Sequence, residues 1–181
     1  MGKKILIGVG IVVALLVAAF FYLNNRNRTL SPPGDTSISA GDMEVSVTYS
    51  RPSVRDRLVF GDAADGALQP YGVYWRLGAN EPTFLEVNQD FTFGDAAIAA
   101  GKYVIYAIPQ DGAMELRLNT DLRMWGYTEP DYDQDIASTI ASTTTGAFTE
   151  QFTIEAIEDA AGAKLVFNWG EYQWELLLEK K

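Results

Sequence analysis

The sequence predicts an all-β domain, an antiparallel β-sandwich that is jelly-roll-like or barrel-like, attached to one N-terminal transmembrane helix. Two observations predict this arrangement. Residues 5–23 form a run of nineteen residues without a charged side chain. From residue 37 onward, apolar side chains recur at every second position between turns rich in Gly, Asp and Pro. That period is typical of half-buried strands, and no later segment shows a sustained helical period.

The apolar run suits a membrane. As a helix, residues 5–23 would span ~28 Å, close to the ~30 Å hydrocarbon core of a bilayer. One interpretation is a cleaved signal peptide, for which Ala18 and Ala19 are suitably small. The apolar run continues through Leu23, however, which favours an uncleaved single-pass anchor. A short tail, residues 1–4, ahead of the span indicates an N-terminus inside the cell and a periplasmic or cell-surface domain.

The charges divide the chain into two parts. The first 28 residues carry four basic residues and no acidic one, whereas the whole chain has a net charge of -10, which leaves -14 for the remainder. Such an acidic domain argues against a nucleic-acid partner. Residues 24–35 contain several Asn and then Pro32 and Pro33, and predict an extended linker. The β domain is expected to occupy residues 36–181.

The strands follow from alternation. In residues 43–50, Met43, Val45, Val47 and Tyr49 alternate with polar side chains, which predicts one buried face. Residues 101–108 are apolar on both faces, which predicts a central strand that Pro109 would end. Further strands are predicted over residues 83–88, 91–93, 96–98, 114–119, 148–157, 163–169 and 172–178.

The chain contains no Cys and no His. This excludes disulfides, Ser-His and Cys-His nucleophile pairs, and zinc sites with nitrogen or sulfur ligands. We expect neither a metal nor a cofactor. The spacing of Asp131, Asp133 and Asp135 imitates the start of a calcium loop, but Ile136 stands where such a loop needs Gly. We therefore interpret this segment as a solvated acidic loop.

Several short motifs occur in a fixed order. Tyr49-Ser50-Arg51-Pro52-Ser53 with Arg57, the run from Trp75 through Arg76-Leu77-Gly78-Ala79-Asn80-Glu81-Pro82 to Thr83, and Trp125-Gly126 are the main ones. With these motifs the chain resembles, over roughly residues 31–178, a bacterial family known only as domain of unknown function 2911. The family pattern has Gly before the second arginine, where this chain has Asp56. The resemblance implies an exported or membrane-attached protein and implies no catalytic residue.

Polar and aromatic residues near predicted turns form a candidate ligand-binding site. Its members are Arg51, Arg57, Trp75, Arg76, Asn80, Glu81 and Thr83. Because a guanidinium is a planar fork of donors, they could bind a carboxylate or sulfate. The alternative is structural: Arg76 pairs with Glu81 in a buried ion pair, and Asn80 closes a turn by bonding to backbone.

Two functions remain open. The first is a non-catalytic binding module of the cell envelope with an anionic or saccharide ligand. Exposed rings would serve a saccharide, whereas an aromatic core would explain them without one; the rings concerned are Tyr103, Tyr106, Trp125, Tyr127, Tyr132, Trp169, Tyr172 and Trp174. The second is a hydrolase acting on a saccharide or envelope polymer through two carboxylates. The candidates for that role are Glu81, Glu86, Asp111, Glu150 and Glu155.

Overall fold

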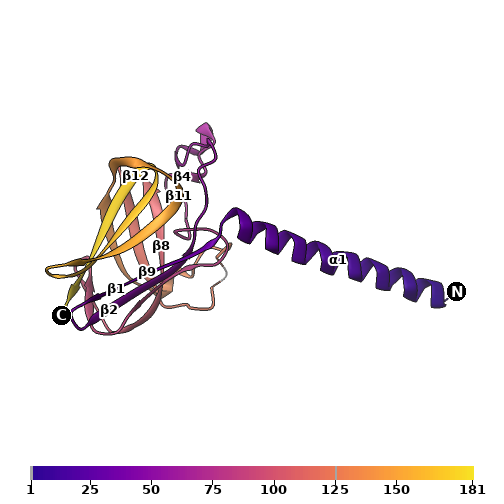
Figure 1. Cartoon of the computed structure of the whole chain (residues 1–181), viewed down its shortest axis with the longest axis horizontal. Coiled ribbons are helices and arrows are strands. Elements are labelled where there is room, and N and C mark those ends of the chain that lie inside the picture. Colours follow the sequence, from indigo (N-terminus) through magenta and orange to yellow (C-terminus); the bar gives the residue numbers. More distant parts are fainter. Residues whose placement is uncertain (1, 125) are drawn as a thin grey trace.

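One long helix, α1 (Gly2–Leu30), stands apart from the rest of the chain in the computed structural model, which describes residues 2–124 and 126–181 (Figure 1). Its apolar side chains are exposed along the whole helix; Leu16 and Phe20, for example, are each 66% exposed. Among the described residues it is the one helix long and apolar enough to cross a membrane. A continuous apolar surface of this kind indicates an N-terminal signal or anchor rather than a helix in water.

The helix is longer than the apolar run. It continues past Leu23 to Leu30, and strand β1 begins at Pro33, so the prediction of an extended linker over residues 24–35 is wrong. Thr29 Oγ1 donates to the Asn25 carbonyl at 3.0 Å, and the Ser31 amide donates to the Asn27 carbonyl at 2.9 Å. Pro32 ends the helix, because a residue before proline disfavours helical backbone.

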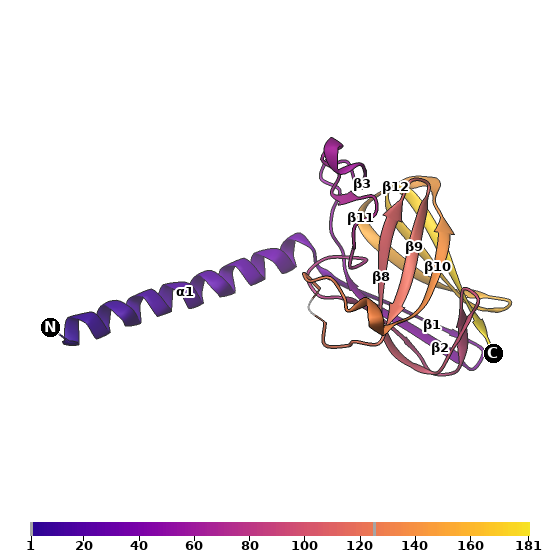
Figure 2. The same ribbon diagram turned by 180° about the vertical axis from the view of Figure 1, so that it is seen from behind.

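Two antiparallel sheets face each other in the β domain (Figures 1 and 2). The first has the order β1–β2–β5–β8–β9–β10, with bounds Pro33–Ala40, Met43–Ser50, Thr83–Val87, Gly101–Gln110, Ala113–Asn119 and Asp135–Ser142. The second has the order β11–β12–β6–β7, with bounds Thr144–Asp159, Gly162–Lys180, Phe91–Phe93 and Ala96–Ile98. Buried side chains of both sheets form a single core, which confirms the predicted sandwich.

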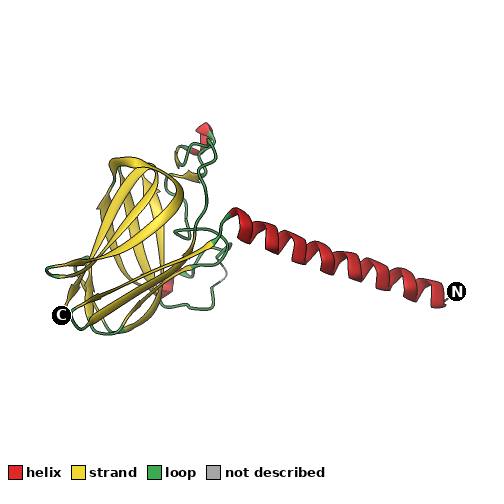
Figure 3. Ribbon diagram, viewed as in Figure 1, coloured by secondary structure: helices red, strands yellow, loops and turns green. Residues whose placement is uncertain are grey.

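Two irregular segments lie at the end of the domain from which α1 leaves (Figures 1 and 2). The first, residues 51–82, connects β2 to β5 and contains the short parallel pair β3 (Phe60–Gly61) and β4 (Gln69–Pro70) and the 3-10 turn η1 (Ala63–Asp65). The second comprises residues 120–124 and 126–131 and precedes the 3-10 turn η2 (Tyr132–Gln134). In Figure 3 loops predominate at this end of the domain, and the long helix ends beside them.

Alternation placed most strands correctly. β2 buries Met43, Val45, Val47 and Tyr49, as predicted. β8, however, continues through Pro109 to Gln110 instead of ending there. Its neighbour β5 pairs with β8 only up to residue 105. Proline has no backbone N–H to donate. Because β5 does not pair with β8 at Pro109, no β5–β8 hydrogen bond is lost there, and the proline is tolerated.

Two further strands differ from prediction. Residues 163–169 and 172–178 belong to one strand, β12, which passes through Gly170 in the left-handed region (φ 62°). β10 was not predicted. It presents Ile136 and Ile140 to solvent and turns Ala137 and Ala141 inward. The large apolar residues of β10 therefore lie on its exposed face and the small ones on its inner face, so alternation of large apolar residues does not predict this strand.

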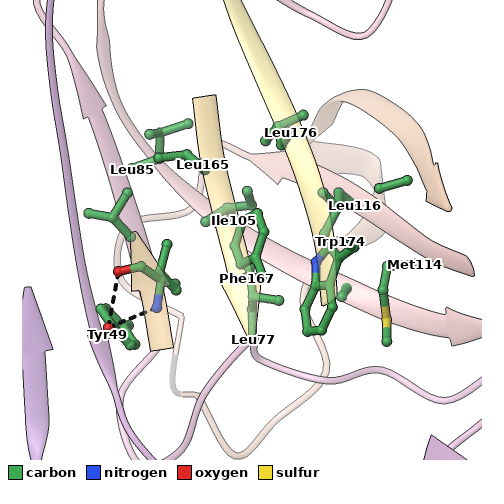
Figure 4. Packing of buried hydrophobic residues seen from close by; sticks show 14 of the residues in the cluster. Tyr49, Leu77, Leu85, Ile105, Met114, Leu116, Leu165, Phe167, Trp174 and Leu176 are labelled. Atoms are coloured by element: carbon green, nitrogen blue, oxygen red, sulfur yellow. Dashed lines mark hydrogen bonds between the residues drawn. The ribbon is translucent and has the colours of Figure 1, made fainter. Parts of the chain in front are cut away.

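Aromatic rings fill the centre of the sandwich. Trp75 and Trp169 stack with centroids 5.3 Å apart, and the rings of Phe167 and Trp174 are parallel at 5.3 Å. Figure 4 shows Phe167 and Trp174 between the two sheets, with Tyr49 at the side. The Tyr49 hydroxyl accepts from the Ile154 amide at 2.9 Å and joins β2 to β11. These rings support the core interpretation of the aromatic residues.

Candidate functional site

A cavity of about 320 Å³ lies where α1 meets the β domain. One wall is the last turn of the helix, with Asn27 and Leu30; the opposite walls come from residues 52–57 and 74–80. Arg57, Trp75, Arg76 and Asn80 of the predicted site line it, and Arg55 joins them; the remaining lining residues are Ser31, Pro52, Ser53, Leu68, Gln69, Tyr74, Gly78 and Ala79. The tertiary fold thus brings together part of the predicted site.

The three arginines of the cavity are held by backbone carbonyls. Arg57 donates through Nε to the Val54 carbonyl at 2.9 Å and through Nη2 to the Ser53 carbonyl at 2.6 Å. Arg55 Nη2 donates to the Leu30 carbonyl of α1 at 3.1 Å. Because a guanidinium has five N–H groups, these bonds fix each side chain and leave other donors free for a ligand.

Arg76 is the most buried of the three. Its Nη1 donates to the Asn80 carbonyl at 3.1 Å, and its guanidinium lies 5.7 Å from the ring centroid of Tyr127. Burial lowers the pKa of Arg76 from its ordinary value. A cation that is partly removed from water favours an anion beside it, because an opposite charge offsets the lost solvation.

The cavity is cationic. No Asp or Glu is among its lining residues, and Arg55, Arg57 and Arg76 form no ion pair within the described part of the chain. Tyr74 adds no negative charge at neutral pH: a tyrosine is ordinarily neutral there, with a pKa of 10.0, and burial raises the pKa of Tyr74 further, to about 12. Three arginines without an ion-pair partner among the described residues therefore line one cavity in a domain whose remaining charge is strongly negative.

The structure contradicts the proposed ion pair between Arg76 and Glu81. Glu81 instead contacts Arg28, in the last turn of α1, and both side chains are about half exposed (53% and 48%). The helix supplied a partner that the sequence did not suggest, because residue 28 was placed in a linker. Glu81 does not line the cavity.

Other members of the predicted site have structural contacts. Trp75 Nε1 donates to the Gly78 carbonyl at 3.0 Å, and the buried Thr83 Oγ1 donates to the Leu77 carbonyl at 2.7 Å. Asn80 Nδ2 donates to the Ser31 carbonyl at 3.2 Å, which ties the loop to the helix end instead of closing a turn. Thr83 lies outside the cavity.

Arg51 also lies outside the cavity and crosses to the second sheet. It donates through Nε to the Phe152 carbonyl at 3.3 Å and through Nη2 to Thr153 Oγ1 at 3.0 Å. Its backbone amide donates to the Pro32 carbonyl at 2.8 Å. Arg51 therefore joins the start of β1 and the end of β2 to β11.

The two loops that form the cavity walls contain residues with left-handed backbone conformation. The non-glycine residues with positive φ in the described chain are Arg55 (52°), Asp56 (54°), Leu77 (52°) and Asn80 (58°). All four belong to the two loops that form the cavity walls. Asp56 occupies the position where the family pattern has Gly, and it still adopts the left-handed turn. Such conformations are costly for side-chain-bearing residues and cluster at functional sites.

Sequence reasoning missed Arg55 and the helix residues of the cavity. Arg55 and Arg57 are two positions apart in the sequence, but the left-handed backbone at Arg55 and Asp56 that brings both to the cavity could not be inferred from that spacing. The contribution of Asn27 and Leu30 could not be inferred while residues 24–35 were treated as linker.

The acidic segment before β10 is not a solvated loop throughout. Asp131 caps η2 by accepting from the Asp133 amide at 3.2 Å. Asp135, with its side chain 14% exposed, accepts from Tyr106 at 2.6 Å, from Arg117 at 3.2 Å and from Asn119 at 2.8 Å. No cluster of acidic residues suited to a metal ion occurs among residues 2–124 and 126–181.

Among the described residues of the β domain, Tyr127, Tyr132 and Phe148 are the exposed aromatic residues, at 79%, 42% and 60%, whereas Trp169 and Trp174 are buried. Trp125 lies outside the described residues. A wider concavity of about 690 Å³ crosses the outer face of β1, β2, β5 and β8 and contains Glu44 and Glu86 without an aromatic ring. It lacks the stacking surface expected of a saccharide platform.

Comparison with known proteins gave one match. Residues 31–178 match the family described as "Protein of unknown function (DUF2911)". No curated protein and no solved structure matched the chain. The matched residues include the whole β domain up to Leu178 and the loops with Arg55, Arg57 and Arg76, but not Asn27 and Leu30 of the helix. The chain belongs to the DUF2911 family of proteins of unknown function.

Proposed function

We propose that this protein is a membrane-anchored, extracytoplasmic binding module that holds an anionic group in the cavity of Arg55, Arg57 and Arg76. The observation that carries this proposal is a cavity with three arginines and no Asp or Glu among the lining residues that the structure describes. Guanidinium groups bind carboxylate, sulfate and phosphate through paired hydrogen bonds, so a compact anion is the fitting ligand.

The same cavity gives no support to the hydrolase. Hydrolysis of a glycosidic bond by the common mechanism needs two carboxyl groups facing the substrate. Neither Glu81 nor Glu150 lines the cavity, and the Glu150 carboxylate accepts from the Arg55 amide at 3.1 Å. The arrangement therefore favours binding without catalysis.

The anchor supports an envelope location. The apolar side chains of α1 are exposed, and the helix end contacts the domain through Arg28–Glu81 and Arg55–Leu30. A cleaved signal peptide would lose these contacts, whereas an anchor keeps them. Mass spectrometry of the protein from washed membranes should find the full chain; a shortened chain in the soluble fraction would contradict the anchor.

Anion binding is tested on the full chain in a nonionic detergent. Glycerol 3-phosphate, sulfate and acetate are titrated at constant ionic strength, and binding is followed by calorimetry. We expect at least one of these anions to bind, with affinity reduced about tenfold in Arg57→Gln, since one charge-assisted contact is lost. Arg123→Gln is the matched control, because Arg123 is exposed and does not line the cavity. Equal affinities of the two variants would refute the proposal.

A further inference from the structure

The helix is not only a tether but also a wall of the cavity. Asn27, Leu30 and Ser31 line it. Three contacts hold this wall in place: Arg28 with Glu81, Arg55 Nη2 with the Leu30 carbonyl at 3.1 Å, and Asn80 Nδ2 with the Ser31 carbonyl at 3.2 Å. The position of the cavity along the helix is therefore fixed by the structure.

That position coincides with a particular layer of a membrane. The uncharged run ends at Leu23, and Asn27 and Leu30 follow four and seven residues later. At the rise of an α-helix they lie ~6 and ~10 Å beyond the end of the run. The polar headgroup layer on each side of a bilayer is roughly 5–8 Å thick. With residues 5–23 in the hydrocarbon core, Asn27 lies within the headgroup layer and Leu30 lies just outside it, so the cavity adjoins the headgroups.

The surface around the cavity suits the same layer. Both irregular segments lie at the end of the domain from which α1 leaves (Figures 1 and 2). Leu58 and Val73 on the first segment and Leu122 and Tyr127 on the second are exposed by 44%, 47%, 43% and 79%. Tyrosine is enriched at membrane interfaces. The two segments carry five arginines beside seven acidic residues, so this end of the domain is far less negative than the rest.

We propose that the anionic group bound by Arg55, Arg57 and Arg76 is the phosphate of a phospholipid of the membrane that α1 spans. This inference rests on the proposed anion-binding function and names its ligand. A phospholipid held in the same bilayer as the anchor has a high effective concentration at the cavity, which a freely diffusing anion does not have. The helix that forms the wall also keeps the cavity next to the headgroup layer.

The charge of the cavity selects among headgroups. Choline and ethanolamine headgroups carry an ammonium beside the phosphate, and the described lining residues include no carboxylate that could pair with that ammonium. A lipid with net negative charge, such as phosphatidylglycerol, places only the phosphate charge against the arginines. We therefore expect phosphatidylglycerol to bind in preference to phosphatidylcholine.

The test uses the full chain in a nonionic detergent, with equal amounts of phosphatidylglycerol and phosphatidylcholine, and counts bound lipids by native mass spectrometry. Wild type should retain phosphatidylglycerol, and Arg57→Gln should lower its affinity about tenfold, as expected for one lost charge-assisted contact. Arg123→Gln, which makes the same charge change on an exposed side chain outside the cavity, should bind as wild type. Glycerol 3-phosphate, the soluble source of the same chemistry, should bind more weakly than the lipid.

Each other outcome separates the two proposals. Phosphatidylglycerol binding that is equal in Arg57→Gln and Arg123→Gln, or no stronger than phosphatidylcholine binding, overturns the lipid inference. If glycerol 3-phosphate, sulfate or acetate still distinguishes the variants, the anion-binding function stands without it. If neither lipid nor soluble anion distinguishes them, both fail. Near-UV circular dichroism confirms folding, and Arg55→Gln, also at an exposed residue, replaces Arg57→Gln if that variant unfolds.

Discussion

Arg28 in the last turn of α1 contacts the carboxylate of Glu81 in the loop before β5, and so joins the helix to the domain. Both side chains are about half exposed, 53% and 48%. Exposed ion pairs contribute little to stability because water screens them. The pair therefore positions the helix end without holding the fold together.

The first prediction concerns this pair. A double-mutant cycle of Arg28→Gln and Glu81→Gln should give a coupling free energy below about 1 kcal/mol in urea unfolding of the full chain. A coupling of about 3 kcal/mol or more would indicate a buried pair instead. Lys164→Gln with Glu175→Gln offers a comparison on β12, since that pair is also partly exposed.

The second prediction concerns Arg51. Arg51→Gln removes two hydrogen bonds from a charged, half-buried side chain to β11. We expect the free energy of unfolding to fall by about 2 kcal/mol. Because Arg51 does not line the cavity, anion affinity should stay unchanged in the calorimetric titration. Lost affinity in a variant that remains folded would show that the cavity extends to Arg51.

The third prediction concerns the structural role of Thr83, whose side chain is fully buried. Thr83→Val removes the hydroxyl that donates to the Leu77 carbonyl at 2.7 Å. The stranded carbonyl should cost about 1–3 kcal/mol of unfolding free energy. Thr83→Ser keeps the hydroxyl and serves as the control. Equal stabilities of wild type and Thr83→Val would show that the hydrogen bond contributes nothing.

The fourth prediction is a pH dependence. Burial, followed by the hydrogen bond to Asp135, raises the pKa of Tyr106 above its ordinary value of 10.0. The native state therefore keeps this proton where the unfolded state has lost it. The stabilisation is fully present below pH 10 and is lost as pH rises above it.

The measurement is urea unfolding of the full chain between pH 8 and 11. In Tyr106→Phe the fall in unfolding free energy above pH 10 should be shallower, by up to ~1.4 kcal/mol per pH unit. Tyr127→Phe is the control, because that ring is 79% exposed. Identical slopes in wild type and Tyr106→Phe would contradict a buried, protonated Tyr106.

Much of the β domain could be predicted because burial of one sheet face imposes a period of two. β2 shows this clearly, with Met43, Val45, Val47 and Tyr49 inward. β10 escaped because its inward positions are small, Ala137 and Ala141, whereas Ile136 and Ile140 face outward. A period of two is recognised when large apolar residues lie on the buried face and polar residues on the exposed face, and β10 has its large apolar residues on the exposed face.

The candidate site was predictable only in part. Arg57, Trp75, Arg76 and Asn80 line the cavity, whereas Arg51, Glu81 and Thr83 lie outside it. Residues close in sequence can point to opposite sides of a loop, and left-handed backbone at Leu77 and Asn80 decides which side. No spacing rule reports such a turn when the residue is not glycine.

By itself the sequence determined the apolar helix, the β-sandwich and the family, because these depend on patterns along the chain. Only the tertiary structure decided which arginines meet. Arg55 and Arg76 are 21 positions apart in the chain and share one cavity with the end of α1. Their approach depends on the path of two loops and on a helix that extends to Leu30. Long-range packing and backbone hydrogen bonds fix these features, and local residue patterns do not encode them.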